Sequence, residues 1–287
     1  MTTDPDRLLR LDGRVALVTG ASYGLGVLFA DVLARAGADV AVMARSADKL
    51  ADTRKLVEAH GRRCVAVEGD VTSYADCEAA AAACVNELGT IDVLVNNAGW
   101  ADDRLMRTEH VDPESFARMV QVDLVGLFYM TRAAAPTMLA AGRGSIINLS
   151  SIFGMAGSEN RTAGYFAAKG GVNQLTRQLA CEWGDRNVRV NALAPNFFIS
   201  EMTRTLLEDS GMATWMRSRT PMRRLGELDE LVGPLLFLAS DASSFVTGHV
   251  LTVDGGWSAS GGYAQLPQPW DEWNGEAGTP IGPVTVP

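Results

Sequence analysis

The sequence predicts a single α/β domain, doubly wound, with a parallel sheet of about seven strands and helices on both faces. Two observations support this prediction. Short apolar runs alternate with longer helical patterns from Val15 onward, which is typical of a parallel sheet covered on both sides. The chain has 287 residues, of which 47% are hydrophobic, and this is enough for the core of one large domain or two small ones.

The predicted strands are β-rich runs that end in small or polar residues. They cover residues 14–20, 39–45, 63–70, 91–99, 144–151, 188–195 and 249–256. Helical patterns over residues 25–37 and 46–61 connect the first three strands. Ligands of such sheets bind beyond the carboxyl ends of the strands, so we expect the functional residues to gather there.

The domain is predicted to span residues 1–257, because no change of composition and no Gly/Ser linker interrupts them. Residues 258–287 form a tail rich in Gly, Pro and Trp. Two interpretations of the tail stand. Its composition favours a disordered end, whereas its aromatic side chains favour an arm packed on the body or on a neighbouring subunit.

Charge and composition exclude several classes of protein. The 25 Lys and Arg against 34 Asp and Glu give a net charge of −9, which leaves no basic field for nucleic acid or an anionic membrane. A polar N-terminus and the lack of an apolar run of roughly 18 residues predict a cytoplasmic protein without a membrane span. The four cysteines and three histidines lack the spacing of a disulfide framework or a zinc site.

The first predicted strand ends in a glycine-rich turn, Thr19–Gly26, which reads TGASYGLG. Glycine lets the backbone turn tightly, and the free N–H groups at the start of the next helix favour a pyrophosphate. Alone, this turn is weak evidence, because glycines also simply end strands. Its position at the first strand-to-helix junction and the motifs that follow strengthen it.

Further motifs follow in register with that turn. They are GDV at 69–71, NNAG at 96–99, NLSS at 148–151, YFAAK at 165–169 and DGGW at 254–257. With TGxxxGxG they resemble the short-chain dehydrogenase/reductase family from about Leu11 to Trp257, which implies a Rossmann fold and a nicotinamide dinucleotide. The cofactor residues that the resemblance implies are Gly20, Ser22, Tyr23, Gly24, Leu25, Gly26, Arg45, Asp70, Val71, Asn97, Ala98, Gly99, Tyr165, Lys169, Pro195, Phe198 and Ser200.

The cofactor preference depends on the end of the second predicted strand. An acid about twenty residues past the glycine turn selects NAD, whereas an arginine accommodates the 2′-phosphate of NADP. Ala44 stands where the acid is expected and Arg45 follows it, which favours NADP(H) and leaves NAD possible. Arg45 as a solvated residue at a helix entrance is the alternative. NADP-preferring relatives often have a second basic residue in the glycine turn, where this chain has Tyr23.

Tyr165 and Lys169 are four positions apart, on one face of a predicted helix. A free tyrosine has a pKa of about 10 and is a poor base at neutral pH. An ammonium beside it, together with the positive charge of an oxidised nicotinamide, favours the phenolate and lowers that pKa. Such pairs also arise on helices without function. The end of a predicted strand at Ser150 and Ser151, facing the same crevice, favours the functional interpretation.

The resemblance assigns roles to three residues of this crevice. Ser151 hydrogen-bonds the substrate oxygen, Tyr165 is the general acid/base, and Lys169 tunes Tyr165 and holds the nicotinamide ribose. The implied activity interconverts a secondary alcohol and a ketone, in a direction that stays open. Residues 200–226 lie where the family has a variable substrate lid, although helix packing explains their apolar side chains equally well. The candidate substrate residues are Phe153, Asn196, Met202 and Leu206.

Two positions depart from the family pattern. Asp123 stands where relatives carry an asparagine that helps hold a water against the lysine, and a carboxylate is charged and only accepts hydrogen bonds. Near Lys169 it should hold the ammonium more firmly and partly cancel its effect on Tyr165. We expect a shifted pH profile, with serious impairment as the alternative. Asn196 follows Pro195 where relatives have glycine, and asparagine tolerates a positive φ.

The sequence therefore predicts an NADP(H)-favouring oxidoreductase for a small carbonyl or alcohol substrate. Two alternatives stand beside it. One is a dinucleotide-binding sensor or scaffold without turnover, which Asp123 and Asn196 motivate; the other is a dehydration or epimerisation with bound cofactor. The resemblance also implies a homotetramer or homodimer, with the helices that begin near Asp112 and Thr162 at the interface.

Overall fold

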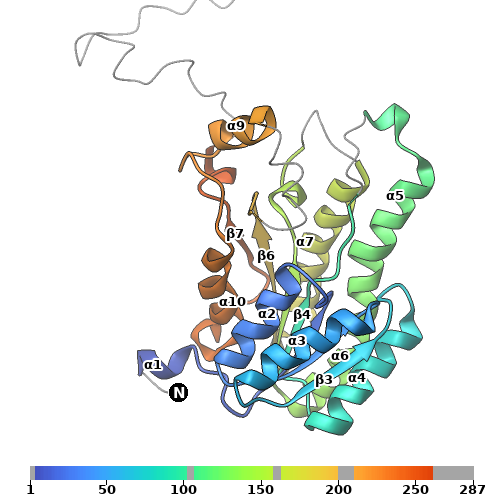
Figure 1. The fold of residues 1–287 in the computed structure, drawn as a ribbon, viewed down its shortest axis with the longest axis vertical. Helices are drawn as coiled ribbons and strands as arrows, with labels where there is room; N and C mark the ends of the chain where they lie inside the picture. The colour runs from blue at the N-terminus through green and yellow to red at the C-terminus, as the bar shows by residue number, and fades with distance from the viewer. Residues whose placement is uncertain (1–3, 102–106, 158–162, 200–209, 261–287) are drawn as a thin grey trace, which may run out of the picture.

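The computed structural model describes residues 4–101, 107–157, 163–199 and 210–260. Seven parallel strands form one sheet in the order β3-β2-β1-β4-β5-β6-β7, which confirms the predicted fold class (Figure 1). The strands are β1 Val15–Thr19, β2 Asp39–Ala44, β3 Cys64–Glu68, β4 Val93–Asn96, β5 Gly144–Leu149, β6 Val188–Pro195 and β7 Val250–Val253.

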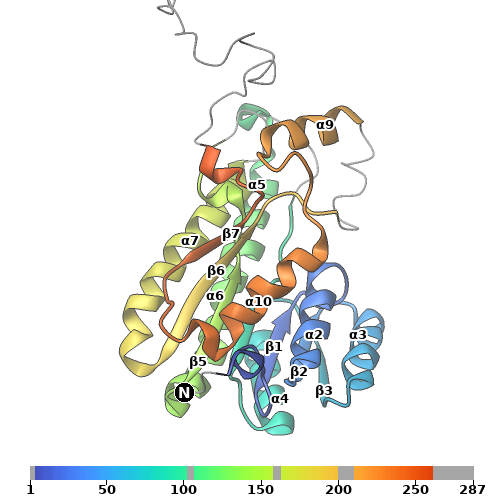
Figure 2. The same ribbon diagram turned by 90° about the vertical axis from the view of Figure 1, so that its left-hand side faces the viewer.

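Helices connect the strands and cover both faces of the sheet. The α-helices are α1 Pro5–Leu8, α2 Leu25–Arg35, α3 Ala47–Ala59, α4 Tyr74–Leu88, α5 Pro113–Val120, α6 Leu127–Ala141, α7 Ala163–Trp183, α9 Ser210–Arg219 and α10 Val232–Ala239. A π-helical segment, η2 Gln121–Gly126, joins α5 to α6, and a 3-10 turn, η3 Ile152–Gly154, follows β5. Figure 2 shows α6 and α7 on one side of the sheet and α2, α3 and α10 on the other.

Two hydrophobic cores lie against the two faces of the sheet. Successive side chains of a strand point to opposite faces, so Ala16 and Val18 of β1 enter one core while Leu17 enters the other. Phe29 of α2 fills the first core, and Met138 of α6 fills the second. A strand that is buried on both faces reads as a continuous apolar run, which is why the sequence predicts this sheet well.

The crevice of the fold lies beside β1. This strand pairs with β2 on one side and with β4 on the other, so the strand order changes direction at β1. The loops that follow β1 and β4 therefore separate beyond the carboxyl ends of the strands, where α/β sheets bind their ligands.

One helical run corrects the expectation about membrane spans. Residues Pro113–Ala141 form a run of 29 residues that is long and apolar enough to cross a membrane by length and composition. The run is this long because α5, η2 and α6 follow one another without a break. The sequence alone does not show that these three elements are continuous. Met119, Met130 and Met138 of the run are fully buried in the protein, as in any long helix that covers a sheet. Length and composition are therefore weak evidence of a membrane span here.

Candidate active site

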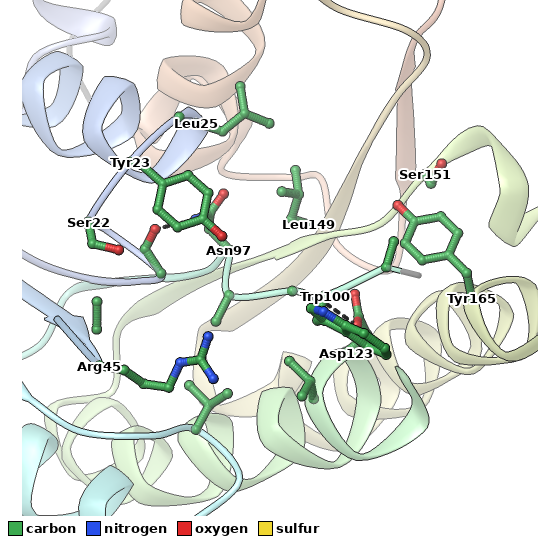
Figure 3. Close-up of a pocket in the computed structure, with 18 of the residues that line it drawn as sticks. Ser22, Tyr23, Leu25, Arg45, Asn97, Trp100, Asp123, Leu149, Ser151 and Tyr165 are labelled. Carbon is green, nitrogen blue, oxygen red and sulfur yellow. Dashed lines mark hydrogen bonds between the residues drawn. The ribbon is translucent and has the colours of Figure 1, made fainter. Parts of the chain in front are cut away.

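A cavity of about 280 Å³ lies at the carboxyl ends of the strands, beside β1. Loops after the strands β1 to β6 line it, together with α5, η2 and α7. Figure 3 shows the glycine-turn residues Ser22 and Tyr23 at one end and Ser151 and Tyr165 at the other. The size and the mixture of apolar and polar side chains suit a small-molecule site.

The turn after β1 presents bare backbone to the cavity. Gly20 has a φ of +67°, and a Cβ added to it would lie 2.7 Å from Ala98 Cα, so only glycine fits there. Gly24, at a φ of 60°, is the N-cap of the 11-residue helix α2. The unpaired N–H groups at the start of α2 face this turn, and they form the kind of surface that binds a phosphate. The turn therefore fits the pyrophosphate of a dinucleotide.

The loop after β4 is tied to the same turn. Asn97 Nδ2 donates to the Thr19 carbonyl at 2.9 Å and to the Gly20 carbonyl at 3.2 Å. Thr19 Oγ1 in return accepts from the backbone N–H groups of Asn97 and Ala98. These bonds use the Asn97 side chain to hold two loops together, while residues 97–99 line the cavity.

The side chains expected at the adenosine end lie together. Asp70 and Val71 line the cavity, and Asp70 Oδ1 accepts from the N–H and hydroxyl of Thr72 at 2.9 Å each. Tyr23 and Arg45 line the same end. Lys49 of α3, which the sequence analysis did not consider, holds its Nζ 5.7 Å from the centre of the Tyr23 ring. This end therefore carries two cations.

The two serines after β5 have different environments. Ser150 Oγ donates to Asn173 Oδ1 at 2.6 Å, and Asn173 in turn donates to the Gly154 carbonyl, so Ser150 fastens η3 to α7. Ser151 Oγ accepts from the Phe153 N–H and hydrogen-bonds the Tyr165 side chain. Figure 3 shows Ser151 and Tyr165 next to one another. Both serines line the cavity, and Ser151 is the one of the two that hydrogen-bonds Tyr165.

Lys169 lies one turn after Tyr165 on α7, as the spacing predicts. Its Nζ donates to the Leu149 carbonyl at 2.9 Å and lies 5.5 Å from the centre of the Tyr165 ring. Asp123 Oδ1 lies 3.0 Å from the same Nζ, and both side chains are almost fully buried, with exposed fractions of 1% for Asp123 and 5% for Lys169. The other carboxylate oxygen accepts from the Trp100 N–H at 2.9 Å.

Burial and charge act against each other on this pair. Burial raises the pKa of Tyr165 and Asp123 raises it further, whereas Lys169 and the Ser151 hydrogen bond lower it; the net direction is upward. Burial lowers the pKa of Lys169, but Asp123 and Tyr165 raise it, and the net direction is again upward. From the sequence, the lysine and an oxidised nicotinamide together are expected to lower the tyrosine pKa. Lys169 alone does not, because burial and the extra carboxylate outweigh its ammonium.

The cavity reaches β6 at its far end. Pro195, Asn196 and Phe198 line it. Asn196 Nδ2 donates to Thr220 Oγ1 at 3.3 Å and to the Asp254 carbonyl at 3.1 Å. The asparagine therefore ties the end of β6 to the segment after α9 and to the end of β7.

Comparison with known proteins identifies the fold family. A family model described as enoyl-(acyl carrier protein) reductase matches residues 20–258. Gluconate 5-dehydrogenase of Gluconobacter oxydans is 39% identical over 256 residues, which cover 89% of this chain and 98% of that protein. The chain belongs to the short-chain dehydrogenase/reductase family. Members of this family use NAD or NADP as their cofactor.

Two further members of the short-chain dehydrogenase/reductase family illustrate its range. Galactitol 2-dehydrogenase of Cereibacter sphaeroides is 41% identical over 253 residues, covering 88% of this chain and 97% of that protein. A solved structure of gluconate 5-dehydrogenase from Burkholderia cenocepacia, in complex with NADP and tartrate, matches with a TM-score of 0.85 at 36% identity. The match covers 89% of this chain and 99% of that one.

Most residues predicted from the family pattern lie in the cavity wall, and a few do not. Gly26 lies beneath it, where a Cβ would collide with the Gly20 carbonyl oxygen. Phe153 packs behind Tyr165 in an aromatic cluster with Phe166, Phe197 and Trp257. It is not among the described residues that line the cavity, and its contact with a substrate stays a prediction. Ser200, Met202 and Leu206 lie outside the described residues.

The described part of the expected lid, residues 210–226, supports the packing interpretation for its apolar side chains. Ala213, Met216 and Leu225 are buried. Gly226 forms a bridge with Phe198, whose ring fills the space beside the glycine. The segment is thereby fastened to the end of β6.

The structure adds cavity residues that the sequence analysis does not identify. They are Met43, Ser46, Trp100, Ala101, Arg118, Val122 and Leu149. Trp100 directly follows the NNAG motif, and Arg118 lies five residues before Asp123 on the same helical run. One α-helical turn before Asp123 lie Met119 and Val120, so the sequence spacing does not indicate Arg118. Within the described ranges, no group of three or more His, Cys, Asp or Glu is placed to hold a metal ion.

Proposed function

We propose that the chain is an oxidoreductase that interconverts a secondary alcohol and a ketone, with NADP(H) favoured over NAD(H). The observation that carries the proposal is the convergence of Ser151, Tyr165 and Lys169 at one end of a cavity whose other end is the glycine turn. The related gluconate and galactitol dehydrogenases support a hydroxyl-bearing carbon as the point of reaction.

The side chains divide the proton chemistry among them. When bound, the nicotinamide supplies or accepts hydride. Ser151 donates a hydrogen bond to the substrate oxygen, and Tyr165 gives that oxygen a proton in reduction or removes it in oxidation. Lys169, fixed between the Leu149 carbonyl and Asp123, places its positive charge beside the phenol and holds the ribose hydroxyls.

Charge at the adenosine end supports the preference for NADP(H). Among the described residues, Arg45 forms no ion pair and no hydrogen bond, and Ala44 leaves no carboxylate to bind a ribose 2′-hydroxyl. Lys49 adds a second cation beside Tyr23, in place of the basic residue missing from the glycine turn. A guanidinium without an internal partner is suited to a phosphate.

A panel of secondary alcohols and ketones, read at the NADPH absorbance with both cofactors, tests the proposal. We expect turnover with stoichiometric loss or gain of NADPH and a lower rate with NADH. Arg45→Gln should weaken NADPH binding by about 10-fold and leave NADH binding unchanged, because it removes a charge-assisted hydrogen bond. Arg54→Gln is the control, because Arg54 lies on α3, the helix that follows Arg45, and is paired with Glu58. Turnover without any change in NADPH would contradict the proposal in favour of dehydration or epimerisation.

The ion pair between Asp123 and Lys169 gives a reason to keep the second candidate, a dinucleotide-binding sensor without turnover. A carboxylate that neutralises the lysine weakens its support of the phenolate. Binding of NADPH without hydride transfer to any member of the panel would favour the sensor. Hydride transfer that disappears in Tyr165→Phe would exclude it.

Assembly and location follow from the resemblance. A homotetramer or homodimer would use α5 and α7, and Phe116 of α5 and Phe128 of α6 expose 39% and 41% of their surface. Sedimentation that shows only monomer would contradict this assembly. A cytoplasmic location, the division at residue 257 and the role of residues 258–287 stay predictions.

A further inference from the structure

Arg118 and Trp100 form a stacked pair in the wall of the cavity. The Arg118 guanidinium carbon lies 4.5 Å from the centre of the Trp100 ring, within the range of a cation–π contact. Both residues line the cavity that Ser151 and Tyr165 also line. Trp100 lies in the loop after β4 and Arg118 lies on α5, so the pair connects these two parts of the cavity wall.

Contacts place this pair at the catalytic end of the cavity. The Trp100 N–H donates to Asp123 Oδ2 at 2.9 Å, and Asp123 Oδ1 lies 3.0 Å from Lys169 Nζ. Lys169 in turn lies 5.5 Å from the Tyr165 ring. An unbroken series of contacts therefore leads from the arginine to the tyrosine.

The charges of the cavity wall single out Arg118. Of the residues that the structure describes, three cations line it, Arg45, Arg118 and Lys169. Lys169 is paired with Asp123, and Arg45 lies at the end with the glycine turn. Arg118 forms no hydrogen bond or ion pair with any residue in the described ranges, so its positive charge is available to a ligand at the catalytic end.

We propose that Arg118 binds a carboxylate of the substrate, so that the preferred substrates are hydroxy acids or keto acids. This inference rests on the proposed alcohol and ketone chemistry. A guanidinium offers a planar pair of donors that matches a carboxylate. Stacking on Trp100 fixes the plane of the guanidinium, so less side-chain freedom is lost when a substrate binds. The reacting carbon can then be held at Tyr165 by an interaction at a distant part of the substrate.

Matched substrates test the inference. The kinetic parameters kcat and KM are measured for D-gluconate, which carries a carboxylate, and for galactitol, which is neutral. Wild type, Arg118→Gln and Arg118→Lys are compared. In Arg118→Gln we expect kcat/KM for gluconate to fall about 10- to 100-fold, mainly through KM, because a charge-assisted hydrogen bond is lost. The value for galactitol should stay within about twofold, and Arg118→Lys should recover part of the loss. Arg132→Gln, whose guanidinium stacks on Tyr74 at the same 4.5 Å outside the cavity, is the control and should change neither.

Binding measurements separate this inference from failure of the proposed function. Calorimetry of D-gluconate binding to the protein with NADPH should show the same loss in Arg118→Gln even if neither compound is turned over. The NADPH dissociation constant, measured by fluorescence, should stay unchanged. Weaker NADPH binding with equal losses for both substrates would assign Arg118 to a cofactor phosphate and overturn the inference. An equal response of both substrates, or a wild type that binds only neutral polyols, would also overturn it.

Discussion

The two ends of the cavity are built from different parts of the chain. The end that we propose to bind phosphate consists of backbone: Gly20 and Gly24 at positive φ, followed by the first N–H groups of α2. The end that we propose to be catalytic consists of neighbouring side chains, namely Asp123, Lys169 and Tyr165. The first end depends on shape, and the second depends on where charge and protons lie.

Because of this difference, the two ends of the cavity tolerate different substitutions. One added methyl group disturbs the phosphate end, because no space is left above Gly20. At the catalytic end, replacing one oxygen or one charge with a group of the same shape leaves the packing intact and alters the chemistry. The two ends can therefore be disrupted separately, and the separation can be measured as cofactor affinity against rate.

The largest effect is expected from Tyr165→Phe, which removes the phenolic oxygen and keeps the ring. A positioned general acid contributes about 100- to 10,000-fold to the rate, so kcat should fall by that factor. NADPH binding should stay within about threefold, because the cradle at Gly20 is unchanged. Steady-state rates and NADPH fluorescence check both parts. A variant that keeps more than a tenth of the wild-type kcat would show that another group supplies the proton.

Gly20→Ala should disturb the opposite end. A residue with a Cβ in the left-handed conformation costs roughly 1–2 kcal/mol, and this Cβ would also press against Ala98 Cα. We expect a lower free energy of unfolding and about 10-fold weaker NADPH binding, equivalent to ~1.4 kcal/mol. Denaturant unfolding and fluorescence titration measure the two effects.

Gly61→Ala is the matched control for that variant. Gly61 has a φ of +70°, and a Cβ added to it would meet nothing within 4 Å. Gly61→Ala therefore has the same backbone strain as Gly20→Ala but lacks its close contact with a neighbouring residue. It should lose stability and keep its NADPH affinity. Equal losses of affinity in both variants would show that general destabilisation, and not the cradle, weakens cofactor binding.

The sequence predicted those features that depend on residues close together in the chain. The alternation of strands and helices indicated the sheet, because both faces of its strands are buried. The spacing of Tyr165 and Lys169 placed them on one helical face. The position of Ser151 at a strand end indicated the shared crevice, although only the structure shows that Ser150 bonds Asn173 while Ser151 bonds Tyr165.

Features that depend on distant contacts could not be predicted. The stacking of Arg118 on Trp100 joins two elements whose approach is determined by packing. The π-helical segment that holds Asp123 has no clear sequence pattern, and such segments are frequent at functional sites. The orientation of Phe153 depends on a 3-10 turn. The net direction of the Tyr165 pKa depends on burial, which spacing alone does not give.

The smallest and most specific effect is expected from Asp123→Asn. Asp123 raises the pKa of Tyr165, so removing its charge should lower that pKa. Oxidation uses the phenolate and increases as pH rises through this pKa, so its midpoint should move to lower pH. Reduction uses the phenol and decreases above the same pKa, so its falling limb should move the same way. The loss of kcat at the plateau should be smaller than the ~100-fold minimum for losing a general acid. Rates measured across pH in both directions check these shifts.

A second buried carboxylate provides a control. It shows whether the shift in the pH profile comes from Asp123 itself or from losing any buried carboxylate. Asp92, with an exposed fraction of 3%, is paired with Arg143 at 2.8 Å, and Asp92→Asn should leave both midpoints in place. A midpoint that moves to higher pH in Asp123→Asn would contradict the prediction. It would mean that the main effect of Asp123 is to keep the buried Lys169 protonated, since burial lowers the pKa of Lys169 and Asp123 opposes that. A neutral lysine no longer stabilises the phenolate, so the catalytic end would then depend on the ion pair itself and not on the lysine alone.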